Sequence, residues 1–361
     1  MDVSLEVWLE ALWERRGSDL LLIGDSPPRV RVSGRLVVLE GAPILTDEQI
    51  REIAWSLLSV EQREHFATFL DVDFAFSWGD RARVRGSLFT QRGQRALALR
   101  MIPAKIPTFE ELALPLAADF VVNQPRGFVL VTGPTGSGKS TTLAAIINRI
   151  NETRAAHILT IEDPVEYVHH HKMAAVSQRE VGLDSPSFER ALRSALREDP
   201  DVLLVGEMRD LDSIQIALTM AETGHLVFAT LHTNDAPQAI DRIIDVFPPE
   251  RQEQTRVQIA ASLNTVIAQR LIPKIGGGMV AAFEVLIATN SVRNLIREGR
   301  TSQLPNIMFT NSKEGMQTLE SDLARLIRDG VVAYEDALEV SAHPKELARA
   351  LEQTGISAPK E

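Results

Sequence analysis

Residues 127–142 have the sequence GFVLVTGPTGSGKSTT, which is the strongest indication of the fold. The apolar run 128–131 is typical of a buried strand, and the residues after Ser140 continue in a helical pattern to Ile150. Between these two segments, Gly133 to Ser140 match G-x-x-x-x-G-K-[ST], a loop that cradles phosphate between a strand and a helix. The stretch therefore predicts a P-loop nucleotide site.

We expect this loop to bind ATP with Mg²⁺. Its backbone N–H groups can surround phosphate oxygens, Lys139 can place a positive charge at the β- and γ-phosphates, and the Ser140 hydroxyl can complete a Mg²⁺ shell. The predicted nucleotide-binding residues are Gly133, Pro134, Thr135, Gly136, Ser137, Gly138, Lys139, Ser140 and Thr141.

Three further apolar runs each end in polar side chains. In chain order they are 157–161 before EDPVE (162–166), 202–205 before GE (206–207), and 226–231 before HTN (232–234). Such short apolar runs are typical of buried parallel strands, whose carboxyl ends meet at one edge of the sheet. We therefore predict a doubly wound α/β core with these polar residues gathered around the phosphates.

Phosphoryl transfer to water needs one carboxylate for the water and another for the metal. Because Gly206 stands where an aspartate is usual, Glu207, in the Walker-B position, is expected to serve Mg²⁺ and Glu166 the water. The reverse assignment stays open. His232 is the expected phosphate sensor. His225 begins the same strand, roughly 23 Å away, and is expected to relay to a neighbouring element or subunit.

Composition narrows the functional classes. The chain has 361 residues, 49 acidic and 38 basic, so its net charge of −11 gives no reason to expect nucleic acid as a partner. With no cysteine, thiolate catalysis and cysteine-bound metals are excluded. Neither an export signal nor about 20 consecutive apolar residues are present, so we expect a cytoplasmic protein without direct membrane insertion.

The pattern along the chain predicts two domains. Residues 1–102 suggest an α+β unit, prolines then indicate a linker at 103–118, and 119–361 hold the α/β core. Beyond residue 235 the pattern looks mostly helical, with a C-terminal helical part from about 290. The run His169 to His171 is interpreted as a solvated loop, because consecutive residues do not easily converge on one metal ion.

The order of GPTGSGKSTT, ILTIEDPVEYV, DVLLVGEMRD and TGHLVFATLHTND resembles the type II/IV secretion ATPase superfamily, with its Walker A, Asp-box, Walker B and His-box motifs. Nearly the whole chain is similar to the type IV pilus retraction ATPases of the PilT and PilU type, including SDLLLIGDSPPRVRVSGRL near the start and SVRNLIREGR and KEGMQTLESDLARLI near the end. The resemblance implies a PAS-like N-terminal domain, a RecA-like core and a homohexamer that binds ATP between subunits.

The resemblance also implies that the neighbouring N-terminal domain supplies arginines to the nucleotide, here Arg85 in RVRGSLF and Arg100 in ALALRMIP. It implies a hexameric motor ATPase that powers pilus retraction and twitching motility through an inner-membrane platform protein, possibly with a paralogous ATPase. The alternatives are an accessory ATPase of the PilU type, a pilus or secretion assembly ATPase, a low-turnover nucleotide-binding regulator and a DNA-translocating ring. Assembly ATPases usually carry a four-cysteine element, which this chain lacks.

Overall fold

The computed structural model describes residues 4–32, 34–208 and 210–353, and the chain divides into two compact units, Met1–Lys105 and Ile106–Glu361. Each unit has its own hydrophobic core. Residues 106–118, predicted as part of a linker, pack with the second unit, where the side chain of Phe109 is buried. Within the described ranges, no helix combines the length and the apolar character needed to cross a bilayer.

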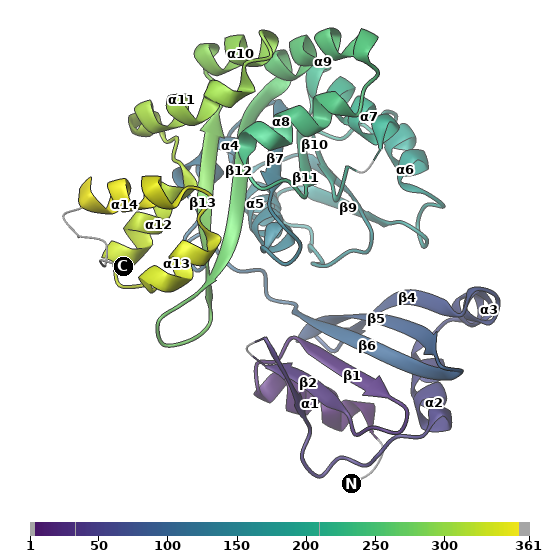
Figure 1. Cartoon of the computed structure of the whole chain (residues 1–361). Helices are drawn as coiled ribbons and strands as arrows, with labels where there is room; N and C mark the ends of the chain where they lie inside the picture. Colours follow the sequence, from purple (N-terminus) through teal and green to yellow (C-terminus); the bar gives the residue numbers. More distant parts are fainter. Residues whose placement is uncertain (1–3, 33, 209, 354–361) are drawn as a thin grey trace. The chain divides into compact units, whose positions relative to one another are not determined.

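The N-terminal unit is an antiparallel sheet in the order β3-β2-β1-β6-β5-β4, with helices packed on its core face (Figure 1). Its strands are β1 (Asp19–Ile23), β2 (Arg29–Val32), β3 (Arg35–Val38), β4 (Asp71–Trp78), β5 (Ala82–Gln91) and β6 (Gln94–Pro103), and its helices are α1 (Leu5–Glu14), α2 (Asp47–Leu57) and α3 (Val60–Phe69). Helix α2 begins with a capping box, in which the Thr46 hydroxyl accepts from the Gln49 N–H and the Gln49 side chain accepts from the Thr46 N–H.

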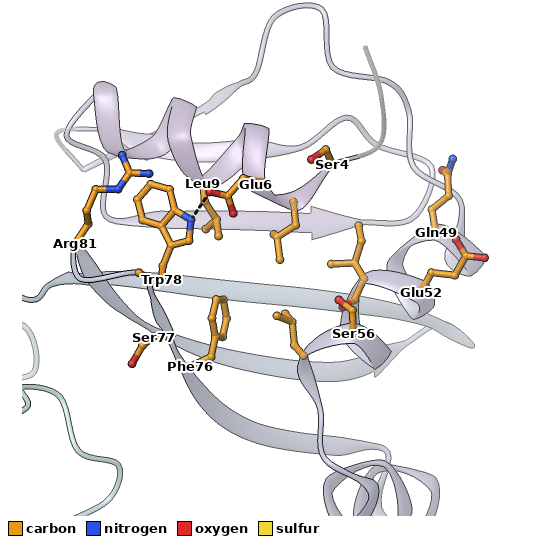
Figure 2. Close-up of a pocket in the computed structure, with 14 residues that line it drawn as sticks. Ser4, Glu6, Leu9, Gln49, Glu52, Ser56, Phe76, Ser77, Trp78 and Arg81 are labelled. Atoms are coloured by element: carbon orange, nitrogen blue, oxygen red, sulfur yellow. Dashed lines mark hydrogen bonds between the residues drawn. The ribbon is translucent and has the colours of Figure 1, made fainter.

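A groove of about 840 Å³ lies between α1, α2 and β4 of this unit. Figure 2 shows its apolar and polar lining, with the Trp78 indole N–H donating to the Glu6 carboxylate at 2.8 Å. Arg81, also in the lining, stacks on the Trp78 ring and pairs with Glu10. None of the residues predicted to act on nucleotide lines this groove.

The second unit is built on a sheet in the order β13-β12-β7-β11-β10-β8-β9, parallel except for β13 (Figure 1). Its strands are β7 (Gly127–Thr132), β8 (His157–Glu162), β9 (Ala175–Glu180), β10 (Val202–Val205), β11 (Leu226–Leu231), β12 (Leu263–Pro273) and β13 (Met279–Ile287). The predicted doubly wound α/β core is confirmed.

Successive residues of a strand point to opposite faces of the sheet, and here the side chains on both faces are apolar. Helices therefore cover both faces. In β7, Phe128 and Leu130 pack on one helical layer, while Val129 and Val131 pack on another. The first layer holds α6 (Phe188–Ala195), α7 (Leu211–Glu222), α8 (Ala236–Asp245), α9 (Pro249–Ser262), α10 (Asn290–Arg297) and α11 (Leu304–Thr310), and the second holds α4 (Leu116–Val122) and α5 (Lys139–Thr153).

The region after residue 235 differs from the mostly helical expectation. Strands β12 and β13 form a long antiparallel hairpin there, and Gly276, Gly277 and Gly278 make its turn with left-handed backbone angles. The helices α12 (Leu319–Arg328), α13 (Tyr334–Val340) and α14 (Pro344–Gln353) follow and pack on the hairpin through Ile272 and Ala282. The helical part from about 290 is therefore present, but it rests on two strands that the sequence pattern did not reveal.

Candidate functional site

The P-loop joins β7 to α5, and its glycines are required by the backbone. Gly133, Gly136 and Gly138 have φ angles of +146°, +80° and +89°, in the range that favours glycine. A Cβ atom at Gly133 would lie 2.4 Å from the Gln269 carbonyl oxygen and 2.6 Å from Ser137 Oγ. The sequence therefore folds into a loop whose backbone is open to a ligand and closed to larger side chains.

Lys139 is the first residue of α5, and its ammonium group turns back over the loop. Nζ donates to the carbonyl oxygens of Gly133, at 2.7 Å, and Pro134, at 3.1 Å. Burial lowers the Lys139 pKa, while the nearby carboxylates of Glu207 and Glu166 oppose that shift. The lysine charge thus lies within the electrostatic reach of both predicted carboxylates.

His232 connects Lys139 to Glu207. Its Nδ1 lies 3.4 Å from Lys139 Nζ, and its Nε2 lies 3.1 Å from Glu207 Oε1. Because an ammonium group can only donate a hydrogen bond, Nδ1 accepts from Lys139. The imidazole ring thus lies between the Lys139 ammonium group and the Glu207 carboxylate and contacts both.

Strand order explains why these residues meet. β11 lies between β7 and β10, so its end at Leu231 places His232 between the P-loop and the Glu207 segment. Gly206 follows β10 where it passes closely by β8, and a Cβ there would make a tight contact of 3.1 Å with the Ile161 carbonyl oxygen. The glycine at the position of the usual aspartate therefore has a steric reason.

Glu166 lies in the segment that follows β8, at the same edge of the sheet. The next residue, Tyr167, is buried, and its hydroxyl lies 3.1 Å from Thr141 Oγ1, one turn into the helix that the P-loop opens. This contact ties the Glu166 segment to the phosphate loop. Lys139, Glu166, Glu207 and His232 are thus brought together by four neighbouring strands.

Three other predicted residues lie elsewhere. His225 is at the opposite end of β11, where its Nδ1–H donates to the Met220 carbonyl at 2.9 Å. Arg85 and Arg100 belong to the N-terminal unit, where they are directly opposite each other on β5 and β6. The Arg100 guanidinium donates to Asp19 at 2.8 Å.

The histidine run is a loop in which His170 and His171 are exposed, as expected, whereas His169 is not solvated. His169 is buried, and burial together with the charges of Lys172 and His170 lowers its pKa to about 4. The ring nitrogen Nδ1 of His171 accepts from the Val176 N–H at 3.0 Å. These histidines therefore support the local structure next to β9.

Two glutamines next to the site were not predicted from the sequence. The Gln269 amide, in β12, donates to the Ser137 carbonyl oxygen of the P-loop at 2.5 Å, and Gln178, in β9, binds the segment that carries Glu166. The Gln269 contact could not be predicted because the strand that carries it, residues 263–273, was not predicted. An alternation of polar residues, Gln178 and Glu180, at the end of β9 is the sequence signal that could have indicated the second.

The loop fits the nucleotide that its motif predicts. Among the residues that the structure describes, none forms a hydrogen bond with the buried Ser137 Oγ, so this hydroxyl is available to a bound phosphate. Within residues 4–32, 34–208 and 210–353, no group of three or more histidines, cysteines or carboxylates could cage a metal ion by itself. Mg²⁺ commonly binds through one or two protein ligands and substrate phosphates, which Ser140 and Glu207 would suit.

Comparisons with known proteins agree with this geometry. Residues 94–279 match the family described as type II/IV secretion system protein. The chain is 48% identical to "Type IV pilus retractation ATPase PilT" of Pseudomonas aeruginosa over 91% of this chain and 95% of the relative, and 42% identical to "Type IV pilus ATPase PilU" of the same organism over 93% and 88%.

A solved structure of "the Pilus Retraction Motor PilT and Bound ADP" superimposes with a TM-score of 0.88 at 46% identity, covering 96% of this chain and 100% of that one. The predicted RecA-like fold class, with a smaller N-terminal domain and C-terminal helices, is confirmed by this likeness. The chain belongs to the type II/IV secretion system protein family, among relatives of the pilus retraction ATPase type.

Proposed function

We propose that this chain hydrolyses ATP as a homohexamer and uses the energy to retract type IV pili. The observation that carries the proposal is the row of contacts from Lys139 through His232 to Glu207, at the edge of the sheet where the P-loop opens. The named activity of its relatives, which this chain matches along most of its length, supports the same function.

Each residue at this edge has a role in the proposed reaction. The P-loop N–H groups and Lys139 bind the β- and γ-phosphates, and Glu166 orients and deprotonates the attacking water. Glu207 and Ser140 would hold Mg²⁺, which would neutralise charge that develops on the phosphates. His232, which contacts both Lys139 and Glu207, responds to the γ-phosphate that Lys139 binds.

The proposed motor has further parts that rest on family resemblance. The N-terminal PAS-like domain, residues 1–102, supplies Arg85 and Arg100 to the nucleotide of a neighbouring subunit, as arginine fingers do. His225, at the far end of β11, relays between elements or subunits. The ring acts at the cytoplasmic side of the inner membrane on a pilus platform protein.

A second candidate is an accessory role beside a paralogous ATPase, since the chain is also 42% identical to a PilU protein. A paralogue that depends on a second motor would hydrolyse little ATP by itself, so steady-state ATP turnover of the purified protein separates these two roles. Deletion of the gene separates a retraction motor from an assembly ATPase. A retraction motor leaves hyperpiliated cells without twitching motility, whereas an assembly ATPase leaves cells without pili.

Counting pili and measuring twitching zones in the deletion strain, with the wild-type gene or the Lys139→Ala gene returned, tests the proposal. We expect hyperpiliated, non-motile cells that the wild-type gene restores and the Lys139→Ala gene does not. Bald cells, or normal pili and motility, would contradict retraction by this protein.

A further inference from the structure

We propose that Gln178, in β9, is a positioning residue for Glu166, holding the segment 163–169 so that the Glu166 carboxylate faces the phosphate loop. This inference rests on the proposed ATP hydrolysis. Gln178 lies outside the phosphate-binding loop and on a strand two positions away from β10 in the sheet order. Its effect on the reaction is therefore exerted through Glu166.

The Gln178 side chain makes three hydrogen bonds at this place. Its Nε2 donates to the Tyr167 carbonyl at 2.8 Å and to Glu162 Oε1 at 3.2 Å. Its Oε1 accepts from the His169 N–H at 2.7 Å. One half-buried amide thus binds the backbone on both sides of Val168 and a carboxylate at the end of β8.

The segment depends on side chains because it lies between β8 and β9 outside any helix or strand. Its Val165 N–H donates to Glu180 Oε2 at 3.0 Å, and the Glu166 N–H donates to the Glu162 carboxylate. Backbone groups that lack regular partners are costly when buried, so these bonds select one path for the segment.

The strand register brings the supporting side chains together. Thr160 pairs with Gln178 and Glu162 with Glu180 across the parallel strands β8 and β9, so the four side chains share one face. The Thr160 hydroxyl donates to Glu162 Oε1 at 2.7 Å. Gln178 is the member that contacts both the Glu162 carboxylate and the backbone beyond Glu166.

The environment of Glu162 makes this arrangement electrostatically sensitive. Protein atoms surround its carboxyl densely, although the residue is only half-buried by its accessible area, and this burial raises its pKa to about 7. The negative charge of Glu166 adds to the rise, while the bonds from Thr160 and Gln178 lower the pKa. The Gln178 hydrogen bond therefore offsets part of the repulsion between the Glu162 and Glu166 carboxylates.

A displacement of Glu166 should lower kcat more than it lowers the affinity for ATP. The Gln178 bond to the Tyr167 carbonyl acts on the residue whose hydroxyl meets Thr141, so its loss frees both Glu166 and Tyr167. A shift of about 1 Å in a catalytic group can lower a rate on the order of 100-fold. Lys139 and the loop N–H groups, which bind the phosphates, have no contact with Gln178 among the hydrogen bonds described.

The test compares full-length Gln178→Ala with wild type in steady-state ATP hydrolysis and in equilibrium binding of ATP. We expect kcat to fall roughly 10- to 100-fold while the Kd for ATP stays within about threefold. Gln178→Met, which keeps the side-chain length without its polar atoms, should show the same loss. Ser177→Ala is the matched control on the same strand, because Ser177 contacts His157 at 3.0 Å and not the segment; it should match wild type.

The double variant Gln178→Ala with Glu166→Ala separates positioning from general damage. If Gln178 acts through Glu166, the double variant hydrolyses ATP no more slowly than Glu166→Ala alone, since coupled residues are not additive. A wild-type kcat in Gln178→Ala, an additive loss in the double variant, or an undiminished kcat in Glu166→Ala would overturn the inference. Absence of turnover in the wild type would instead overturn the proposed function, and this inference with it.

Discussion

At the scale of single residues, the charge of Lys139 is set by its surroundings. Burial lowers its pKa, whereas Glu207 and Glu166 raise it, and His232 lies directly between the ammonium group and Glu207. An imidazole ring that contacts an ammonium group on one side and a carboxylate on the other is sensitive to a change in the position of either group. His232 is therefore suited to report phosphate contact at Lys139 to Glu207.

His232→Ala should reduce ATP turnover on the order of 10- to 100-fold with little change in ATP affinity, because it removes the connection and leaves the P-loop intact. His225→Ala should have the smaller effect, since His225 lies at the opposite end of β11. Measuring kcat and ATP affinity for both variants shows whether His232→Ala has the larger effect on turnover. Equal losses, or the larger loss for His225→Ala, would contradict the assigned geometry.

The residues of the site were predictable where a rule connects sequence to position. Parallel strands place their ends at one edge, so Glu166, Glu207 and His232 could be grouped before any coordinates. Gln269 could not, because its hydrogen bond runs to a backbone atom 132 residues away and leaves no local pattern. The bond of Gln178 spans 11 residues, and its one sequence signal was the alternation of polar residues at the end of β9. The left-handed glycines of the P-loop, by contrast, were implied by the motif itself.

At the scale of elements, one buried carboxylate joins the catalytic edge to the C-terminal helices. Glu284, in β13, accepts from the Ala236 N–H at 2.8 Å at the start of α8, four residues after His232. It also accepts a backbone bond from Leu319 at the start of α12. Helix N-termini favour an anion, yet burial dominates and raises the Glu284 pKa to about 7.

This shift predicts a dependence of stability on pH. The folded state keeps the Glu284 proton up to about pH 7, while the unfolded chain loses it near 4.5, so the contribution is fully present below pH 4.5 and is lost as pH rises through 7. Glu284→Gln cannot titrate. Relative to wild type, it should therefore gain on the order of 2–3 kcal/mol in unfolding free energy between pH 4.5 and pH 8.

Denaturant unfolding of the second unit at pH 4.5 and pH 8, for wild type and Glu284→Gln, measures this difference directly. Because the other titrating groups are the same in both proteins, their contributions to the unfolding free energy cancel when the variant is compared with wild type at each pH. A difference between the two proteins that stays constant with pH would show that Glu284 does not hold a proton near neutrality.

The element that the sequence concealed is the hairpin of β12 and β13. The segment 263–272, LNTVIAQRLI, has no regular alternation of apolar and polar residues, because β12 is largely buried on both faces, and it follows directly after a helix. Periodicity alone cannot distinguish such a strand from a buried helix. The capping box of α2 was recognisable because both partners are within one turn of sequence.

At the scale of the whole molecule, the site and the proposed arginines belong to different units. Lys139, Glu207 and His232 are in Ile106–Glu361, whereas Arg85 and Arg100 are in Met1–Lys105. If a neighbouring subunit provides the arginines, a defect in one unit can be complemented by a subunit defective in the other. Mixing experiments can therefore show whether hydrolysis depends on ring assembly.

Arg85→Ala and Lys139→Ala proteins should each hydrolyse ATP slowly and regain part of the turnover when mixed and reassembled. Mixed rings contain interfaces that join an intact Lys139 to an intact Arg85. The matched control mixes Lys139→Ala with Glu207→Gln, which are both in the same unit and should not complement. No recovery in the first mixture, or equal recovery in both, would contradict hydrolysis in trans.

We propose that Lys139, Glu166, Glu207 and His232 surround one ATP that the chain hydrolyses. Steady-state ATP hydrolysis by the purified full-length protein with Mg²⁺, beside Lys139→Ala, tests it most directly. We predict measurable turnover in the wild type and a loss of at least about 100-fold in the variant, since Lys139 binds the phosphates that carry the developing charge. Hydrolysis at the wild-type rate by Lys139→Ala would contradict the account.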